Sequence, residues 1–125
     1  MRHAYLVEDD PRIRSHLVPA LAELAEVAVL DFAETEAEAV RWLTLHCDET
    51  DIVIVDIYLR RGTGFGILAH RHKFPLGCRL VVLTNSATEE TRGRCMALGA
   101  DAVFDKTSEL DDFFSYCRAM LPKLH

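Results

Sequence analysis

The amino-acid sequence predicts an α/β domain in which a five-stranded parallel sheet lies between two layers of helices, and two observations support this. Short apolar runs alternate with segments of helical period along all 125 residues, an order typical of βαβ units. The run Ile52-Val53-Ile54-Val55 is apolar without alternation, as expected of a strand covered on both faces. The sequence therefore favours one doubly wound, three-layer domain over residues 1–125.

The first half of the chain contains three predicted strands and two helices. The strands are expected at residues 4–7, 27–30 and 52–55. Asp10 is a good N-cap for the first helix, and Pro19 inside that helix predicts a kink. Thr35 is expected to cap the second helix. Helical spacing predicts two sets of inward positions, which are Ile13, Leu17, Leu21 and Leu24 in the first helix and Ala37, Val40, Leu43 and Cys47 in the second.

The second half continues the alternation with two strands and three helices. A turn containing Gly62, Gly64 and Gly66 leads into the third helix. Strands are expected at residues 80–83 and 102–104, with a helix between them from about Thr88 to Leu98 that closes on Gly99. The last helix is expected to direct one set of side chains inward, namely Leu110, Phe113, Phe114, Cys117 and Leu121.

Composition argues against several functional classes. The formal net charge is -6 and no Lys- or Arg-rich run is present, which argues against a nucleic-acid-binding surface. No apolar run approaches the roughly 20 residues that a membrane span needs. The four cysteines are widely spaced without a Cys-x-x-Cys pair, so the sequence argues against a structural zinc site and fits a protein of the reducing cytoplasm.

Polar side chains follow the predicted strands at the points where these strands end. Glu8 and Asp9 follow the first strand, Asp56 follows the third, Thr84 ends the fourth, and Lys106 lies just past the fifth. Because ligands of open parallel sheets bind beyond the carboxyl ends of the strands, we expect these side chains to share one site. Several carboxylates repel one another unless a cation lies among them. Magnesium fits, since it takes one or two carboxylates and keeps positions for water and phosphate.

This set of residue types suits transfer of a phosphoryl group to a carboxylate. Asp56, ionised beside a metal ion, would act as the nucleophile. Transfer then depends mainly on positioning and on neutralisation of charge. The metal would cover one phosphoryl oxygen, the Lys106 ammonium group a second, and the Thr84 hydroxyl a third. Each residue type therefore has a separate task in the expected reaction.

Four segments, in this order and at these separations, carry a resemblance to a known family. They are residues 5–11 (YLVEDDP), residues 55–59 (VDIYL) with Gly62 and Gly64, residues 81–84 (VVLT) and residues 99–106 (GADAVFDK). Together they make the sequence similar to the response-regulator receiver domains of two-component signalling over essentially its whole length. The resemblance implies a flavodoxin-like sheet with strand order 2-1-3-4-5.

The resemblance also implies a role for each matching residue. Asp56 would be the phosphoacceptor and a ligand to Mg²⁺ or Mn²⁺. Asp9 would bind the metal directly, Glu8 would act through water or as support, and the main-chain carbonyl of Tyr58 would be the third protein ligand. Asp10 would be the helix cap and not a ligand. The switch hydroxyl and the phosphate-binding lysine would be Thr84 and Lys106.

Two departures from the family pattern lie next to Lys106. Thr107 follows it, where many members have a proline, which puts the local backbone in question but leaves the task of the lysine unchanged. The position that usually carries the switch aromatic holds Val103, with Phe104 next to it. Either the rotating ring is missing or Phe104 serves in its place, and an ordinary core position is the competing interpretation of Phe104.

A third departure concerns access to the phosphoryl group. Asn85 follows Thr84, where a small residue is common in the family. Together with the bulky Tyr58, two residues after Asp56, Asn85 would narrow the approach to the site. The hypothesis is that transfer from the partner and spontaneous hydrolysis are both slowed.

The function implied by the resemblance is a phosphorylation-controlled binding switch. A sensor histidine kinase or a histidine phosphotransfer protein would pass its phosphoryl group to Asp56. The surface of the fourth helix, fifth strand and fifth helix would then change, and the same surface would serve a homodimer. The output would be an effector protein or a C-terminal output domain, depending on whether the receiver stands alone. Such a protein catalyses only its own modification and is not an enzyme acting on an external substrate.

Three other classes of protein fit the sequence less well. A hydrolase with an aspartyl intermediate, similar to the haloacid dehalogenase-like phosphatases, needs a second Asp two residues after the nucleophile, where this chain has Tyr58. A phosphorylation-independent interaction module predicts a broken site, whereas every expected group is present. Flavodoxin itself is disfavoured because no Ser/Thr- and Gly-rich phosphate loop follows the first strand.

Overall fold

One five-stranded parallel sheet organises the molecule in the computed structural model, which describes residues 1–74 and 78–120. The strand order is β2-β1-β3-β4-β5, the predicted flavodoxin-like order. The strands are β1 (Arg2–Val7), β2 (Val27–Ala33), β3 (Ile52–Val55), β4 (Arg79–Thr84) and β5 (Ala102–Asp105). Because neighbouring strands are parallel, their carboxyl ends lie at one edge of the sheet.

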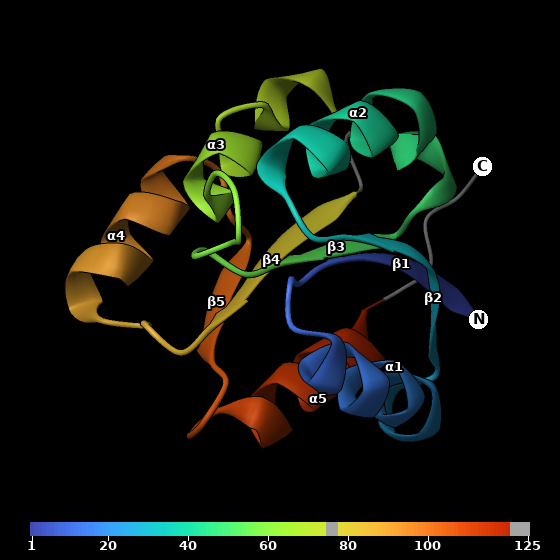
Figure 1. Cartoon of the computed structure of the whole chain (residues 1–125). Helices are drawn as coiled ribbons and strands as arrows, with labels where there is room; N and C mark the ends of the chain where they lie inside the picture. The colour runs from blue at the N-terminus through green and yellow to red at the C-terminus, as the bar shows by residue number, and fades with distance from the viewer. Residues whose placement is uncertain (75–77, 121–125) are drawn as a thin grey trace.

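Helices cover both faces of the sheet and complete the three predicted layers. Figure 1 shows α2 (Glu36–His46), α3 (Gly64–Leu68) and α4 (Glu89–Ala97) on one face. The opposite face carries α1 (Pro11–Ala25) and α5 (Leu110–Ala119). Two short 3₁₀ turns, Cys47–Glu49 and Arg71–Lys73, follow α2 and α3. Within the described ranges, no helix is both long enough and apolar enough to cross a membrane.

Alternating strand side chains divide the core into two clusters, one on each face of the sheet. Val53 and Val55 contribute to the cluster beneath α2, α3 and α4. Ile52 and Ile54 contribute to the cluster beneath α1 and α5, which also contains Phe113. Fully burying one such aliphatic side chain stabilises the fold by about 1.5–3 kcal/mol. β3 is therefore packed on both faces, and Asp56 directly follows this firmly held strand.

Helix α1 begins as predicted, but its buried face differs by one residue from the expected one. The Asp10 side chain accepts a hydrogen bond from the Arg12 N–H at 2.9 Å, and the helix continues through Pro19. Leu24, predicted to face inward, is an exposed residue. Ala25 is buried instead, because a spacing of four residues from Leu21 keeps it on the packed face, and Leu24 falls beside that face.

Helix α2 shows a similar shift of its inward face. The Thr35 hydroxyl caps it, as predicted, by accepting a hydrogen bond from the Glu38 N–H at 3.2 Å. Ala37 is exposed, contrary to the prediction, and Ala39 is buried together with Leu43. The spacing of four between Ala39 and Leu43 sets the phase of the helix, and this phase turns Ala37 toward solvent. Cys47 is buried as predicted but lies in the 3₁₀ turn after α2.

The remaining predicted elements are present with small changes at their ends. β2 extends past its predicted end to Ala33, with a bulge because Ala4 pairs with Val29 and Tyr5 pairs with Asp31. β4 includes Thr84, and β5 includes Asp105. α4 begins close to its predicted start, and the Thr88 hydroxyl caps it by accepting a hydrogen bond from the Thr91 N–H at 3.1 Å. The predicted inward position at Leu121 lies outside the described residues.

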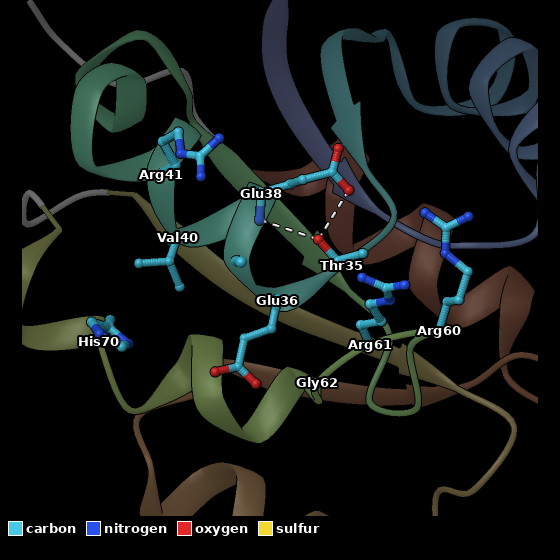
Figure 2. A pocket seen from close by; sticks show the side chains of 10 residues that line it. Thr35, Glu36, Glu38, Val40, Arg41, Arg60, Arg61, Gly62 and His70 are labelled. Atoms are coloured by element: carbon cyan, nitrogen blue, oxygen red, sulfur yellow. Dashed lines mark hydrogen bonds between the residues drawn. The ribbon is translucent and has the colours of Figure 1, made fainter.

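The side chain of Glu36 explains why glycine occupies position 62, in the turn before α3, and position 66, within α3. Its Oε1 atom accepts a hydrogen bond from the Thr63 N–H at 2.9 Å, and Figure 2 shows the side chain directed from α2 toward Gly62 and α3. A Cβ atom on Gly62 would lie 2.4 Å from the Glu36 Cβ, and one on Gly66 would lie 2.2 Å from its Oε2. Gly62 also has a positive φ of 79°, which favours glycine. The loop after Asp56 is thus held against α2.

Candidate functional site

Three carboxylates meet at the carboxyl ends of β1 and β3. Glu8, Asp9 and Asp56 each offer an oxygen atom, and these atoms all lie within 4.8 Å of one another. Two backbone hydrogen bonds fix the loops that carry them, from the Asp56 N–H to the Val7 carbonyl and from the Glu8 N–H to the Ala33 carbonyl, both at 3.0 Å. Carboxylate oxygens in this arrangement fit a hard divalent cation. The sequence predicted this meeting from the strand ends alone.

Lys106 connects two of these carboxylates. Its Nζ atom donates a hydrogen bond to Asp56 Oδ2 at 2.8 Å and another to Glu8 Oε1. The Lys106 N–H donates to the Thr84 carbonyl at 3.0 Å, which continues the β4–β5 pairing beyond the strands. The three charged side chains are 9% (Lys106), 3% (Glu8) and 12% (Asp56) exposed. The lysine therefore lies inside the acidic site and not in the solvent above it.

Burial and the neighbouring charges shift the pKa values of Glu8 and Lys106 in opposite directions. Burial raises the pKa of Glu8, and the hydrogen bond from Lys106 only partly offsets that rise. Burial also works to lower the pKa of Lys106, but hydrogen bonds and charges from Asp56 and Glu8 outweigh it, so the pKa lies above its usual value. Lys106 is therefore a permanent cation at neutral pH, available to an anionic group at this position.

Backbone contacts fix the orientation of Asp56. Its second oxygen, Oδ1, accepts a hydrogen bond from the Ile57 N–H at 2.7 Å. Gly64 lies against the backbone of Asp56, since a Cβ atom there would lie 2.4 Å from the Asp56 carbonyl oxygen. The Gly64 N–H donates to the Ile57 carbonyl at 2.7 Å. The sequence identified Gly64 as part of a turn, but the close approach to Asp56 was not predicted.

The other predicted site residues differ in burial and in their hydrogen-bond partners. Thr84 is buried at the end of β4, and its hydroxyl accepts a hydrogen bond from the Ser86 N–H at 3.2 Å. Asn85 is exposed, and its Oδ1 accepts a hydrogen bond from the Thr107 hydroxyl at 3.4 Å. Tyr58 is also exposed, and its backbone forms an isolated bridge with Thr63.

Phe104 is partly buried and packs against the core cluster beneath α1 and α5. Its ring centroid is 5.9 Å from that of Phe113 and 5.6 Å from that of Tyr116. Strand side chains alternate between faces, and Val103 packs in the cluster beneath α4 whereas Phe104 packs in the opposite cluster. Thr84 pairs with Asp105 across the β4–β5 ladder, so its side chain shares the face of Val103 and not that of Phe104.

Two arginines near the site were not identified from the sequence. Arg14 donates hydrogen bonds to the Glu8 carbonyl at 2.7 Å and to Glu34 Oε2 at 2.9 Å. Arg92 contacts the loops that follow β4 and β5. Neither arginine belongs to a sequence motif, and their partners lie on other elements. Only the folded arrangement brings these groups together.

The fold and this group of side chains define a class of doubly wound α/β domains that concentrate charge at the carboxyl edge of the sheet. The sequence profile of the response regulator receiver domain matches residues 4–118, and the chain belongs to this family. Receiver domains are signalling modules of two-component systems. The resemblance seen in the sequence is thereby confirmed, together with the fold that it implied.

Solved structures support the same assignment. The chain is similar to the non-phosphorylated HemR receiver domain from Leptospira biflexa, with 25% identity, full coverage of both chains (100% each) and a TM-score of 0.80. A response regulator from Burkholderia pseudomallei with a phosphorylated aspartic acid, a calcium ion and citrate gives 20% identity, 95% and 68% coverage of the two chains, and a TM-score of 0.79.

A third similar structure is the CheX–CheY complex with BeF₃ and magnesium from Borrelia burgdorferi. It gives 21% identity, covers 92% of this chain and 88% of the other, and has a TM-score of 0.76. At identities below 25%, such likeness shows the fold alone. The comparison with curated protein sequences gives no match.

Proposed function

We propose that residues 1–125 form a phosphoacceptor switch that receives a phosphoryl group on Asp56 from a histidine kinase or a histidine phosphotransfer protein. One observation carries the proposal: Asp56 lies beside the acidic group of Glu8 and Asp9 and is hydrogen bonded at 2.8 Å to the buried Lys106. The phosphorylated aspartic acid in the Burkholderia pseudomallei structure and the BeF₃ in the Borrelia burgdorferi complex lend support from relatives.

Mg²⁺, or Mn²⁺ in its place, is the proposed cofactor. Asp9, Asp56 and the main-chain carbonyl of Tyr58 would hold it, which suits an ion that prefers oxygen ligands and retains water. Glu8 is bonded to Lys106 and to the Asp10 N–H, so its proposed role is to support the site or to contact the ion through water. When bound, the ion would supply positive charge that a single lysine cannot provide for three carboxylates.

The proposed reaction places one covalent step on Asp56. A carboxylate oxygen forms the bond to phosphorus as the phosphorus–nitrogen bond of the phosphohistidine breaks, and the ring leaves as neutral imidazole because its other nitrogen already carries a proton. Lys106, already bonded to Asp56 Oδ2, would turn its ammonium group to a phosphoryl oxygen. The buried Thr84 hydroxyl, which accepts a hydrogen bond from the Ser86 N–H, would donate a hydrogen bond of its own to another phosphoryl oxygen. Positioning and charge would thus do most of the catalysis.

The proposed output is a change in the face formed by α4, β5 and α5. Thr84 ends β4, and the loop that follows it leads directly into α4, so a shift of Thr84 would reach this face. An effector protein, an attached output domain or a second copy of the chain would bind there. Phosphorylation would bias the face between two arrangements.

The first prediction concerns the phosphorylated residue itself. Incubation with magnesium and acetyl phosphate is expected to add one phosphoryl group to the wild-type protein, detected by intact mass. Asp56→Ala is expected to lose the adduct completely because it removes the nucleophile. Asp10→Asn is the matched control, since Asp10 caps α1 by accepting from the Arg12 N–H and should leave the adduct unchanged. A wild-type protein without an adduct, or an Asp56→Ala variant that keeps one, would overturn the proposal.

A second prediction concerns how long the phosphate remains. Asn85 is held beside the site by Thr107, where it is proposed to restrict the approach of water and of the partner. Asn85→Ala is expected to speed loss of the phosphate about threefold to tenfold, which corresponds to roughly 1 kcal/mol in the barrier. The decay of the adduct should be timed by mass for both proteins side by side. Equal rates would remove the hypothesis.

A further inference from the structure

One arginine connects the two loops that frame the candidate site. Arg92 lies on α4, and its Nε atom donates a hydrogen bond to the Ala87 carbonyl at 3.0 Å, in the loop that follows Thr84. Its Nη1 atom donates to the Val103 carbonyl of β5 at 3.1 Å. Its Nη2 atom donates to Glu109 Oε1, directly before α5. We call these four residues, Ala87, Arg92, Val103 and Glu109, the Arg92 clasp.

Glu109 extends the clasp to the loop that carries Lys106. Its Oε1 atom also accepts a hydrogen bond from the Asp105 N–H at 2.9 Å, and its own N–H donates to the Asp105 carbonyl at 3.0 Å. The hydrogen bond from Arg92, followed by that from Asp105, holds the pKa of Glu109 below its usual value. The carboxylate is therefore ionised at neutral pH and forms a true ion pair with Arg92.

A second contact joins the same two loops closer to the site. The Thr107 hydroxyl donates to Asn85 Oδ1 at 3.4 Å. Both residues depart from the family pattern, and the structure shows that they contact each other. Thr84 and Lys106, the residues proposed to contact the phosphoryl group, are therefore carried by two loops that are tied together at two points.

We propose that the Arg92 clasp favours the unphosphorylated arrangement and couples Asp56 to the face formed by α4, β5 and α5, a step that rests on the proposed function. The Thr84 hydroxyl accepts a hydrogen bond from the Ser86 N–H, so a movement of Thr84 toward a phosphoryl oxygen would draw Ser86, and the loop through Ala87, with it. The guanidinium group is planar and its donors are fixed in one fork. A shift of Ala87 therefore breaks or bends at least one of the three hydrogen bonds.

The placement of the clasp also explains how a local change would reach the surface. β5 is the edge strand between α4 and α5 (Figure 1), and the clasp contacts all three elements or their ends. The side chains of Arg92 and Glu109 are 36% and 31% exposed, so solvent screens part of their attraction. A coupling of moderate size is therefore expected. By linkage, the free energy by which the clasp disfavours binding of the phosphoryl group equals the free energy by which that group weakens the clasp.

The test measures binding of beryllofluoride, an analogue of the phosphoryl group, by isothermal titration calorimetry in the presence of magnesium. Arg92→Gln is expected to bind it about fivefold or more tightly than wild type, because the variant no longer loses the clasp on binding. Glu109→Gln is expected to change the affinity in the same direction. Its amide oxygen can still accept from the Asp105 N–H, so it tests the ion pair with less risk to folding. Arg118→Gln, on the exposed side of α5, is the matched control and should bind as wild type does.

The possible outcomes separate the coupling from its premise. A purely structural role for Arg92 would lower stability in both states equally and leave the affinity for beryllofluoride unchanged. Unchanged or weaker binding by Arg92→Gln and Glu109→Gln, beside normal binding and acetyl phosphate labelling of wild type, would overturn the coupling alone. A wild-type protein that takes no acetyl phosphate and binds no beryllofluoride would overturn the proposed function, and the coupling with it.

Discussion

Replacing Lys106 with methionine is expected to destabilise the metal-free protein by about 3–5 kcal/mol, the range for removing one partner from a buried ion pair. Lys106 forms ion pairs with Glu8 and Asp56. The side chains are 9% (Lys106), 3% (Glu8) and 12% (Asp56) exposed, so the whole group is buried. Without the ammonium group, two carboxylates lie close to Asp9 with no cation among them. Urea denaturation in the presence of a chelator measures the loss.

The pH dependence of this loss follows from Glu8. Burial already raises its pKa in the wild-type protein, and a carboxyl group whose pKa is raised in the folded state stabilises the fold as pH falls and the group takes up a proton. In Lys106→Met this proton would relieve the repulsion that the lysine relieves in wild type. The deficit should therefore be larger at pH 8 than at pH 5.

Two further measurements complete the Lys106 prediction. Magnesium should restore part of the lost stability, because a cation among the carboxylates replaces the missing charge. Labelling by acetyl phosphate should still fall, since the ion does not replace the donor at the second phosphoryl oxygen. Lys73→Met, at an exposed position of the 3₁₀ turn, should change stability by no more than about 0.5 kcal/mol. A loss below 1 kcal/mol for Lys106→Met would contradict the burial argument.

The sequence predicted best where one local pattern determines the structure. The apolar run of β3 required cover on both faces and therefore placed Asp56 at a buried strand end, which the structure bears out. The predicted inward faces of α1 and α2 were wrong at Leu24 and Ala37, because both lie next to the buried stripe and only packing against the sheet selects among neighbouring positions.

Contacts between residues far apart in the chain could not be predicted. Lys106 and Glu8, which form a hydrogen bond, are 98 positions apart in the chain. Their places at strand ends put both at one edge of the sheet, but do not show which carboxylate the lysine contacts. Arg92 and Glu109, which also form a hydrogen bond, are 17 positions apart. In the sequence, Arg92 looks like an ordinary charged residue on the solvent-exposed face of a helix. Phe104 was left between two interpretations, and the register of β5 places it on the face opposite α4.

Gly64→Ala is expected to cost about 3 kcal/mol of stability and to reduce labelling of Asp56 in the same experiment. The new Cβ atom would lie 2.4 Å from the Asp56 carbonyl oxygen, 2.9 Å from Val55 Cγ1 and 3.0 Å from the Ile57 Cα. None of these atoms is the end of a flexible side chain, so the backbone must move, and overpacking at a fixed position costs about 1–3 kcal/mol or more. Because Gly64 lies against the residue that carries the nucleophile, that movement displaces Asp56.

Two other glycines provide matched controls for this prediction. A Cβ atom on Gly66 meets the carboxylate of Glu36, which can rotate away, so Gly66→Ala should cost about 1 kcal/mol, the value of one lost hydrogen bond. Gly93 lies within α4 with nothing within 4 Å, and Gly93→Ala should gain about 0.5–1 kcal/mol, because alanine lowers the entropy of the unfolded chain. Urea denaturation of the three variants should therefore rank Gly93→Ala above wild type, Gly66→Ala below it and Gly64→Ala lowest. If Gly64→Ala proves no more costly than Gly66→Ala, or leaves acetyl phosphate labelling intact, the contact between Gly64 and Asp56 does not position the nucleophile.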